Sequence, residues 1–323
     1  MMESNLKQIV AVKTTQAIES RVATAQIATD PDSDPQLLRK IAIGSDWELR
    51  RLVAGNPNTP TELLWQLGLD FPEAILTNPI FRLLQLEQLQ LAAEMPQATL
   101  TSLLQCEQVP IAFMEYAVGQ QDYGLWLAVA YNPHTPSRLL EHLVQKSRNQ
   151  DRELIRAVAA HPQTPHKLLA EILKIGSGVA QVVAENAHTP ITVLEQILKK
   201  YGQSGDTTFM TLVALHPQIN VQLMLDMQLA PNEFAAQSLW LAKQTDTRSA
   251  ELVELANSDW DPLQLAVARH PNTLRSTIEQ IWQQIRSRHI HPSQIDRVLY
   301  DSFAGNPNTS DQIRGELRKL LEW

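Results

Sequence analysis

Histidines recur at one kind of position in the chain, and a row of imidazole rings could bind a metal ion. His161, His216 and His270 stand where similar segments have asparagine, and His134 and His188 lie just past that position. Asparagine is a poor zinc ligand, so its exchange with histidine favours a role that both can fill, hydrogen bonding to the local backbone. We expect no metal ion at these residues.

Other candidate ligand groups are incomplete. Residues 30–34 read Asp-Pro-Asp-Ser-Asp, similar to the start of a calcium loop, but the positions that need glycine and a bidentate glutamate hold proline and isoleucine. His289 and His291 have only Asp296 nearby to complete a ligand set. Cys106 is the single cysteine, which excludes an internal disulfide and a multi-cysteine zinc site. The sequence predicts no metal and no cofactor.

The chain also lacks the common catalytic motifs. Residues 176–178 read Gly-Ser-Gly, without the third glycine or the preceding strand of a dinucleotide-binding fingerprint. A Gly-x-Ser-x-Gly elbow, a phosphate-binding loop and a His-Glu-x-x-His motif are all missing. We therefore predict no catalytic residues and a protein that is not an enzyme.

The motif behind the histidine and asparagine positions is a repeat. Asn-Pro-x-Thr-Pro stands at 56–60 and 132–136, with variants at 161–165, 186–190, 270–274 and 306–310. With the first proline as position zero, about eleven repeats can be placed at 31, 57, 79, 107, 133, 162, 187, 217, 246, 271 and 307. Flanking residues alone set the register at 79, 107 and 246.

The repeat columns predict pairs of short helices. Positions −8 and −4 are apolar, position −3 is nearly always alanine, and positions +6, +7 and +10 are aliphatic, which is helical spacing on both sides of the turn. No stretch alternates with period two, so we expect an all-α fold without β-sheet. A helix pair that cannot bury its apolar face alone must stack on its neighbours, which makes a solenoid.

The turn residues predict where each helix begins and ends. The first helix should end at the Asn or His, because a residue before proline avoids helical geometry. The threonine should cap the second helix, with the next proline as its first residue. Glu62 and Gln312 lie three residues after Thr59 and Thr309, the spacing of a capping box. The alanine at −3 indicates a close approach of two backbones.

The pattern Asn-Pro-x-Thr-Pro-x-x-Leu-Leu-x-x-Leu, preceded by Val-Ala, resembles the leucine-rich repeat variant family over residues 20–323. The resemblance implies a right-handed solenoid of alternating α- and 3₁₀-helices and no shared enzymatic activity. Some members of the family carry a cysteine-rich iron–sulfur module, which a chain with Cys106 alone cannot hold.

The sequence predicts that the chain has three structural parts. Residues 1–19 would form an N-terminal helical cap, and residues 20–309 the repeats, irregular near 79–106 and 274–306. Residues 310–323 would form a C-terminal closing helix, with Leu317, Leu320 and Leu321 directed inward.

A solvent-facing ridge is the candidate binding surface. Positions −7 and −6 vary in chemistry while −8, −4 and −3 stay apolar, and Arg and Trp are typical of binding hot spots. The candidate partner-binding residues are Arg50, Arg51, Trp126, Arg156, Gln181, Trp240 and Gln264. The alternative is that these tryptophans widen the apolar stripe of the core. Trp47, Trp65, Trp260 and Trp282 share no column and are expected to pack.

Composition limits the function further. Lys plus Arg total 27 against 35 Asp plus Glu, a net charge of −8, which disfavours nucleic acid as a partner. The apolar run Leu125–Tyr131 is far shorter than the ~20 residues of a membrane span, and the start of the chain has no export signal, so we expect a cytoplasmic protein. A scaffold that binds a protein partner is the favoured function. The alternative is a lyase or chaperone-like protein that acts on a bound chromophore or partner.

Overall fold

The computed structural model describes residues 19–88, 90–147, 151–202, 207–288 and 297–321. The chain divides into two compact units, residues 1–158 and 159–323. Within the described ranges every regular element is a helix, which confirms the expected all-α fold. None of the described helices is long and apolar enough to cross a membrane.

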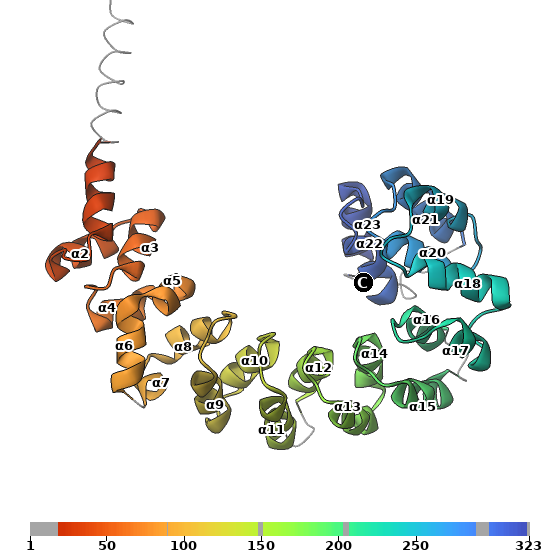
Figure 1. Cartoon of the computed structure of the whole chain (residues 1–323), viewed down its shortest axis with the longest axis horizontal. Coiled ribbons are helices and arrows are strands. Elements are labelled where there is room, and N and C mark those ends of the chain that lie inside the picture. The colour runs from red at the N-terminus through yellow and green to blue at the C-terminus, as the bar shows by residue number, and fades with distance from the viewer. Residues whose placement is uncertain (1–18, 89, 148–150, 203–206, 289–296, 322–323) are drawn as a thin grey trace, which may run out of the picture. The chain divides into compact units, whose positions relative to one another are not determined.

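Unit 1 consists of two layers of short helices. After a helix at 19–29 come α2 (Pro35–Ala42), α3 (Trp47–Gly55), α4 (Thr61–Leu67), α5 (Pro72–Thr77), α6 (Pro79–Glu87), α7 (Leu91–Glu94), α8 (Gln97–Leu104), α9 (Ile111–Gly119), α10 (Tyr123–Tyr131), α11 (Ser137–Ser147) and most of α12 (Arg152–Ala160). The first helices of successive repeats, α3, α5, α8 and α10, contact one another in order. Figure 1 shows α8 and α10 in one layer and α9 and α11 in the other.

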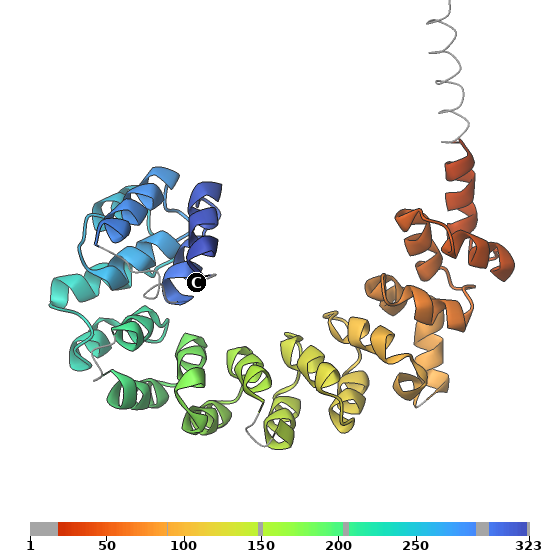
Figure 2. The same ribbon diagram turned by 180° about the vertical axis from the view of Figure 1, so that it is seen from behind.

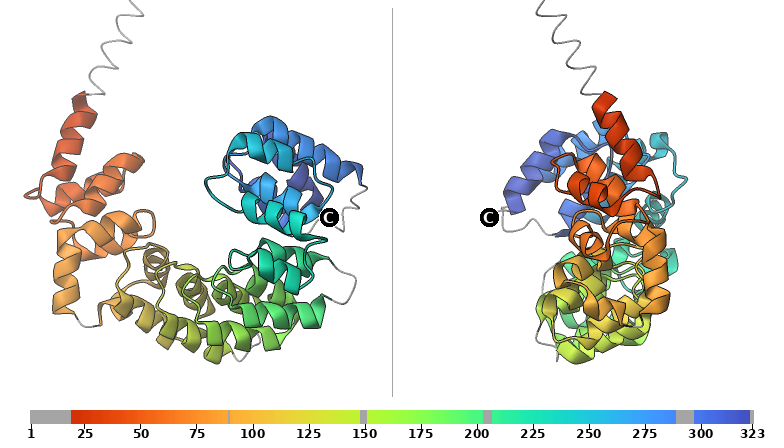
Figure 3. Two further views of the ribbon diagram at one scale, coloured as in Figure 1. Left: turned by 45° about the vertical axis from the view of Figure 1, so that its right-hand side comes forward. Right: turned by 90° about the vertical axis from the view of Figure 1, so that its left-hand side faces the viewer.

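Unit 2 continues the same plan. It contains α13 (His166–Ile172), the 3₁₀ helix η1 (Leu173–Ile175), α14 (Ser177–Glu185), α15 (Ile191–Tyr201), α16 (Thr208–Leu215), α17 (Val221–Asp226), α18 (Glu233–Ala242), α19 (Ser249–Leu255), α20 (Asp261–Arg269), α21 (Arg275–Ser287), α22 (Arg297–Ala304) and α23 (Asp311–Leu321). Helix α20 is central and contacts α16, α18, α19, α21 and α22. Figure 2 shows the helices from behind, and Figure 3 shows the blue helices of this unit gathered together.

Both helices of the typical pair are α-helices. The 3₁₀ alternation that the family resemblance implies is not seen, because η1 is the one 3₁₀ helix in the described part of the chain. The spacing gives the reason. Apolar positions −8 and −4 lie four residues apart, which an α-helix brings to one face and a three-residue 3₁₀ turn does not.

The first helix ends where the sequence predicts. Helix α3 ends at Gly55, and Asn56 follows in an extended conformation with ψ of 127°. The prediction for the threonine is wrong. Thr59 does not cap the second helix but donates its hydroxyl to the Val53 carbonyl oxygen at 2.6 Å. The next residue, Pro60, is extended with ψ of 141° and precedes the first residue of α4.

The predicted capping boxes are absent as well. Glu62 lies 3.6 Å from Arg39 in an ion pair, and Gln312 donates its side-chain amide to Glu316. The threonine bond is general, since the hydroxyl at position +2 reaches the carbonyl at −4 in many repeats. It is made by Ser33, Thr59, Thr135, Thr189, Thr247, Thr273 and Thr309.

Asparagine at position −1 joins each repeat to the one before it. Asn186 donates its side-chain amide to the carbonyl oxygens of Ala159 at 2.7 Å and His161 at 3.0 Å, which are positions −3 and −1 of the preceding repeat. Its Oδ1 accepts from the amide of His188. The same pair of donated bonds is made by Asn56, Asn78, Asn132 and Asn306.

Histidine makes two of the three bonds that asparagine makes, one donated to the preceding repeat and one accepted from the local backbone. In His216 the ring Nδ1 accepts from the Gln218 amide, so Nε2 carries the proton that it donates to the Asn186 carbonyl at 3.0 Å. His270 bonds to the Asn272 amide and the Gln244 carbonyl in the same way. The local backbone role predicted for these residues is confirmed for both rings.

Cations donate to the carbonyl oxygens of the turn in two places. Lys243 donates from Nζ to the carbonyl oxygens of Ala214, His216 and Ile219 of the preceding repeat at 2.6–3.2 Å, and Arg314 of α23 donates to the equivalent three carbonyl oxygens of its own repeat, the last one. The bond from Thr247 to the Leu241 carbonyl places position zero of this repeat at residue 245. The predicted register at 246 is therefore wrong by one residue, because no proline marks the turn there.

The alanine and aliphatic columns are buried as expected. Val53, Val183 and Phe303 at position −4 are fully buried, whereas Ile27 at the same position is 36% exposed.

Asn78 keeps its two bonds although the repeats near 79–106 look irregular in sequence. Leu317 is fully buried and Leu320 partly so. Residues 1–18, the pair His289 and His291, and the Leu321 side chain lie outside the described part of the chain.

Candidate functional site

The prediction of a solvent-facing ridge is correct for some of its residues and wrong for others. At position −6, Arg51 and Arg156 are exposed and Gln181 is partly exposed. Position −7 turns toward the core, and there Ile155, Ala180 and Gln264 are buried. The prediction that Gln264 faces solvent is wrong, because it lies inside unit 2 and donates to the Gln284 side chain.

Two further ridge residues have structural contacts, and a third lies in another column. Arg50 is partly buried, pairs with Asp70 at 2.6 Å and lies over the Phe71 ring at 5.4 Å. Trp126 is partly buried and donates from its indole to the Gln120 carbonyl at 2.9 Å, so the packing alternative fits it. Trp240 is 43% exposed, and the corrected register moves it to position −5.

Position −2 is the variable column that the sequence prediction missed. It lies four residues after −6, so both positions share one helix face. Most of its members are exposed or partly exposed, and they differ widely in chemistry. They are Thr29, Gly55, Thr77, Gln105, Tyr131, Ala160, Glu185, Leu215, Lys243, Arg269 and Gly305. Positions −6 and −2 of the first helices are called the variable face below.

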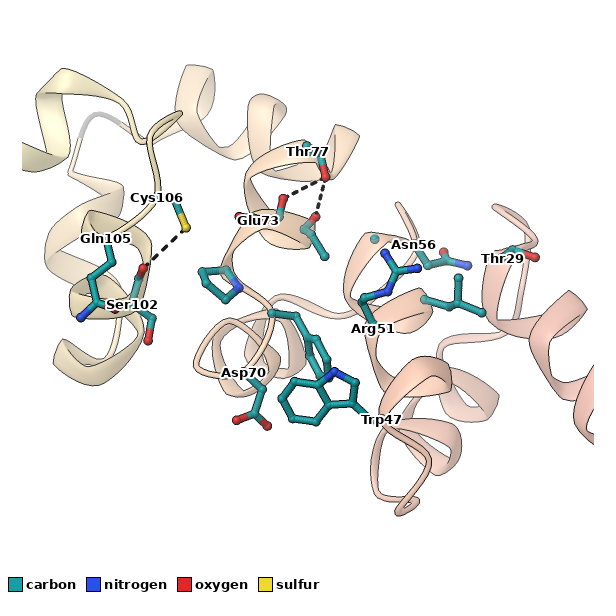
Figure 4. Close-up of a pocket in the computed structure, with 15 residues that line it drawn as sticks. Thr29, Trp47, Arg51, Asn56, Asp70, Glu73, Thr77, Ser102, Gln105 and Cys106 are labelled. Atoms are coloured by element: carbon teal, nitrogen blue, oxygen red, sulfur yellow. Dashed lines mark hydrogen bonds between the residues drawn. The ribbon is translucent and has the colours of Figure 1, made fainter. Parts of the chain in front are cut away.

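In unit 1 the variable face is hollowed by a cavity of about 760 Å³. Its walls come from the helix at 19–29, α3, α5, and the end of α8 (Figure 4). Thr29, Gly55, Thr77 and Gln105, four consecutive −2 residues, line it together with Arg51 of position −6. The repeat register thus builds the cavity, because each first helix contributes the same face.

An exposed tryptophan marks one end of this cavity. Trp47 lines it and is 55% exposed, and it also makes the contact with a neighbouring repeat that the sequence predicts for it. Its ring lies 4.3 Å from that of Phe71, centroid to centroid, and Arg50 lies 5.9 Å above it. Trp65 and Trp282 are buried, as expected. An accessible indole beside a buried aromatic ring is typical of a binding hot spot.

The charges along the cavity leave one carboxylate unpaired. Arg51 pairs with Glu48 at 2.6 Å, and Asp70 pairs with Arg50. Glu73 is exposed and has no ion pair with a described residue. The Cys106 thiol donates weakly to the Ser102 carbonyl, and burial raises its pKa, so it remains an unreactive thiol at neutral pH.

Two of the shifted pKa values in unit 2 belong to side chains that bond to the turns. Burial lowers the pKa of Lys243 to about 8 and also lowers the pKa of His216, which keeps that ring neutral. Both side chains are bonded to backbone atoms, which accounts for their burial. Among the residues that the structure describes, no group of three His, Cys, Asp or Glu side chains could hold a metal ion.

A family model with the description Leucine Rich Repeat Variant domain matches residues 22–69. The match confirms the family resemblance over this stretch. It contains α2, α3 and α4, including Trp47 and Arg51 of the cavity and the Asn56 bonds. The same asparagine bonds recur at Asn186 and Asn306, so unit 2 is built from helical repeats as well. No curated protein and no solved structure was found to match the chain.

Proposed function

We propose that this protein is a non-catalytic scaffold that binds a protein partner through the variable face. The observation that carries the proposal is the cavity of unit 1, where an exposed Trp47 lies among side chains of positions −6 and −2. Residues at −4, −3 and −1 are committed to the core and to the joints between repeats. In unit 1 the residues at −6 and −2 take part in neither and vary in chemistry, as a recognition surface requires.

The partner that suits this cavity presents an apolar side chain next to a lysine or arginine. An apolar group would pack on Trp47 and the Phe71 ring, and Glu73 would attract the cation. The net charge of −8 favours a basic or mixed protein and opposes nucleic acid.

We propose that the repeats extend over residues 20–309, since their turn bonds recur from Asn56 to Asn306.

Native mass spectrometry of the protein purified gently from its own host tests this function. We expect a stoichiometric protein partner that is lost from Trp47→Ala and Glu73→Arg variants. Arg82→Glu is the matched control, because Arg82 is exposed on α6 and does not line the cavity. A coloured small molecule in place of a protein would instead favour a lyase or chaperone-like activity. A partner retained equally by all variants would contradict the assignment of this face.

A further inference from the structure

A smaller cavity lies entirely within unit 2, where α16, α18 and α20 end. Its volume is about 330 Å³, and its walls include Trp240, Lys243, Gln244, Thr245, Arg269 and His270. No Asp or Glu lines it among the described residues, although the whole chain carries a net charge of −8. This cavity is separate from that of unit 1 and has the opposite charge.

Trp240 differs from the residues that other repeats have at the same position. At position −5 other repeats bury small residues such as Ala128, Ala157 and Ala266. Trp240 is instead 43% exposed and lines the cavity. An exposed indole wall offers a flat apolar surface and one N–H donor to a ligand.

Arg269 supplies a cation that is still available. The residue is exposed and donates to the Ser302 hydroxyl at 3.3 Å. Burial lowers the pKa of its guanidinium while Asp301 and Glu185 act in the opposite direction, but it forms no ion pair with a described carboxylate. Two carboxylates stand nearby, Glu185 and Asp301, but Arg297 lies 3.9 Å from the first and 3.4 Å from the second. The guanidinium of Arg269 can therefore still take a planar anion in a two-point contact.

Lys243 adds charge without competing for the ligand. Its Nζ is held by three backbone carbonyl oxygens, so it contributes a positive field and no free donor. The rings of His270 and His216 are likewise occupied by backbone bonds. Among the titratable groups that line this cavity, Arg269 is thus the one with donors to spare.

We propose that this cavity binds a carboxylate attached to a flat aromatic group, with the carboxylate on Arg269 and the ring against Trp240. A cavity of this size is at the lower end of small-molecule sites, large enough for one aromatic acid. The same chemistry occurs in a free aromatic acid and in the C-terminal aromatic residue of a peptide.

Isothermal titration calorimetry of the full chain with 2-naphthoate tests this site. We expect saturable one-to-one binding that weakens at least about tenfold in Arg269→Gln and in Trp240→Leu, since a charged hydrogen bond and a ring contact are lost. The uncharged 2-naphthamide should bind at least about tenfold more weakly than 2-naphthoate. Arg275→Gln, which removes an exposed cation of α21 from the same unit, should change the affinity less than about twofold.

A tetrapeptide that ends in phenylalanine, prepared with a free or an amidated C-terminus, distinguishes the two sources of the ligand. Tighter binding of the free peptide than of 2-naphthoate identifies a protein C-terminus as the ligand, and the reverse identifies a free acid. Circular dichroism checks that each variant is folded, and Arg269→Lys, which keeps the charge without the fork, should bind with intermediate affinity. Absence of binding by both probes, or an affinity that Arg269→Gln leaves unchanged, would overturn the proposal.

Discussion

At the scale of single residues, the turn side chain decides how one repeat joins the next. Asparagine and histidine look unrelated as metal ligands but are equivalent as hydrogen-bonding groups, since each offers one acceptor and at least one donor two bonds away. The exchange between them in the sequence was enough to predict a backbone role. The bonds to the preceding repeat could not be predicted, because the carbonyl oxygens that accept them carry no sequence signal.

Asn186→Ala should destabilise unit 2 by about 2–4 kcal/mol, because two buried carbonyl oxygens lose their donor and the His188 amide loses its acceptor. Asn186→His should cost clearly less, since a histidine ring makes the equivalent bonds at His216. Urea unfolding followed by circular dichroism measures both. Equal losses for the two variants would contradict the equivalence of Asn and His.

The lowered pKa of Lys243 predicts an unusual dependence of the free energy of unfolding on pH. Its pKa is about 8 in the folded chain and 10.5 when unperturbed, so between these values the unfolded chain holds a proton that the folded chain has released. Stability should therefore rise with pH across this window, by up to about 3 kcal/mol, relative to a Lys243→Met variant. Urea midpoints of both proteins from pH 7 to pH 10.5 test it, and parallel pH profiles would refute it.

At the scale of helices, the sequence predicted the elements well and their caps poorly. The helix before each turn ends at the Asn or His because proline forbids helical geometry one residue earlier. The threonine could equally cap the next helix or bond back to the previous one, since both distances are short in sequence. Thr59 and Thr135 are buried in the joint between repeats, and their hydroxyls donate to a carbonyl oxygen of the preceding helix. That burial depends on the neighbouring repeat.

The alanine column sets how closely the helices approach. Ala159 is fully buried and its carbonyl accepts a bond from Asn186, whereas the next residue, Ala160, is exposed. Ala159→Leu should therefore overpack the joint and cost about 1–3 kcal/mol, and Ala160→Leu should cost less than about 0.5 kcal/mol. Thermal unfolding of the two variants side by side measures the difference. A similar loss for both would mean that the column is not a close contact.

The variable face was predicted with an error of one column. Positions −7 and −6 differ by about 100° around a helix, so in α12 Ile155 at −7 reaches the core while Arg156 at −6 reaches solvent. In unit 2, Leu239 and Leu265 at −6 are buried as well. Gln264 and Arg51 illustrate the two outcomes. The polar side chain of Gln264 gave no sign that it would be buried, because its partner Gln284 lies on the second helix of the pair. Position −2 could have been found by following −6 one helical turn onward.

At the scale of the whole molecule, the cavities could not be predicted. The cavity of unit 1 needs four successive first helices in register, and Trp47 lies at its end in a column that no other tryptophan shares. Repeat spacing predicts that helices stack but not the distance between their exposed faces. The cavity of unit 2 arises where the repeat at 245 departs from the common pattern and exposes Trp240.

Charge reversal on the variable face should affect partner binding far more than stability. Glu73→Arg and Arg156→Glu alter exposed side chains, so each should change the free energy of unfolding by less than about 1 kcal/mol. Binding of the co-purified partner should weaken at least about tenfold for Glu73→Arg, because this cavity residue is the carboxylate that attracts the partner's cation. Surface plasmon resonance and thermal unfolding separate the two effects. Unchanged binding by both variants would count against this face.

Site-specific photocrosslinking in the host cell tests the central claim most directly. A photoreactive amino acid at Thr77, an exposed −2 residue in the cavity of unit 1, should crosslink one protein partner. The same amino acid at Arg82, exposed on the second helix α6, should give little or none of that product. A protein crosslinked at Arg82 as strongly as at Thr77, or no protein at either residue, would contradict a scaffold that binds its partner through the variable face.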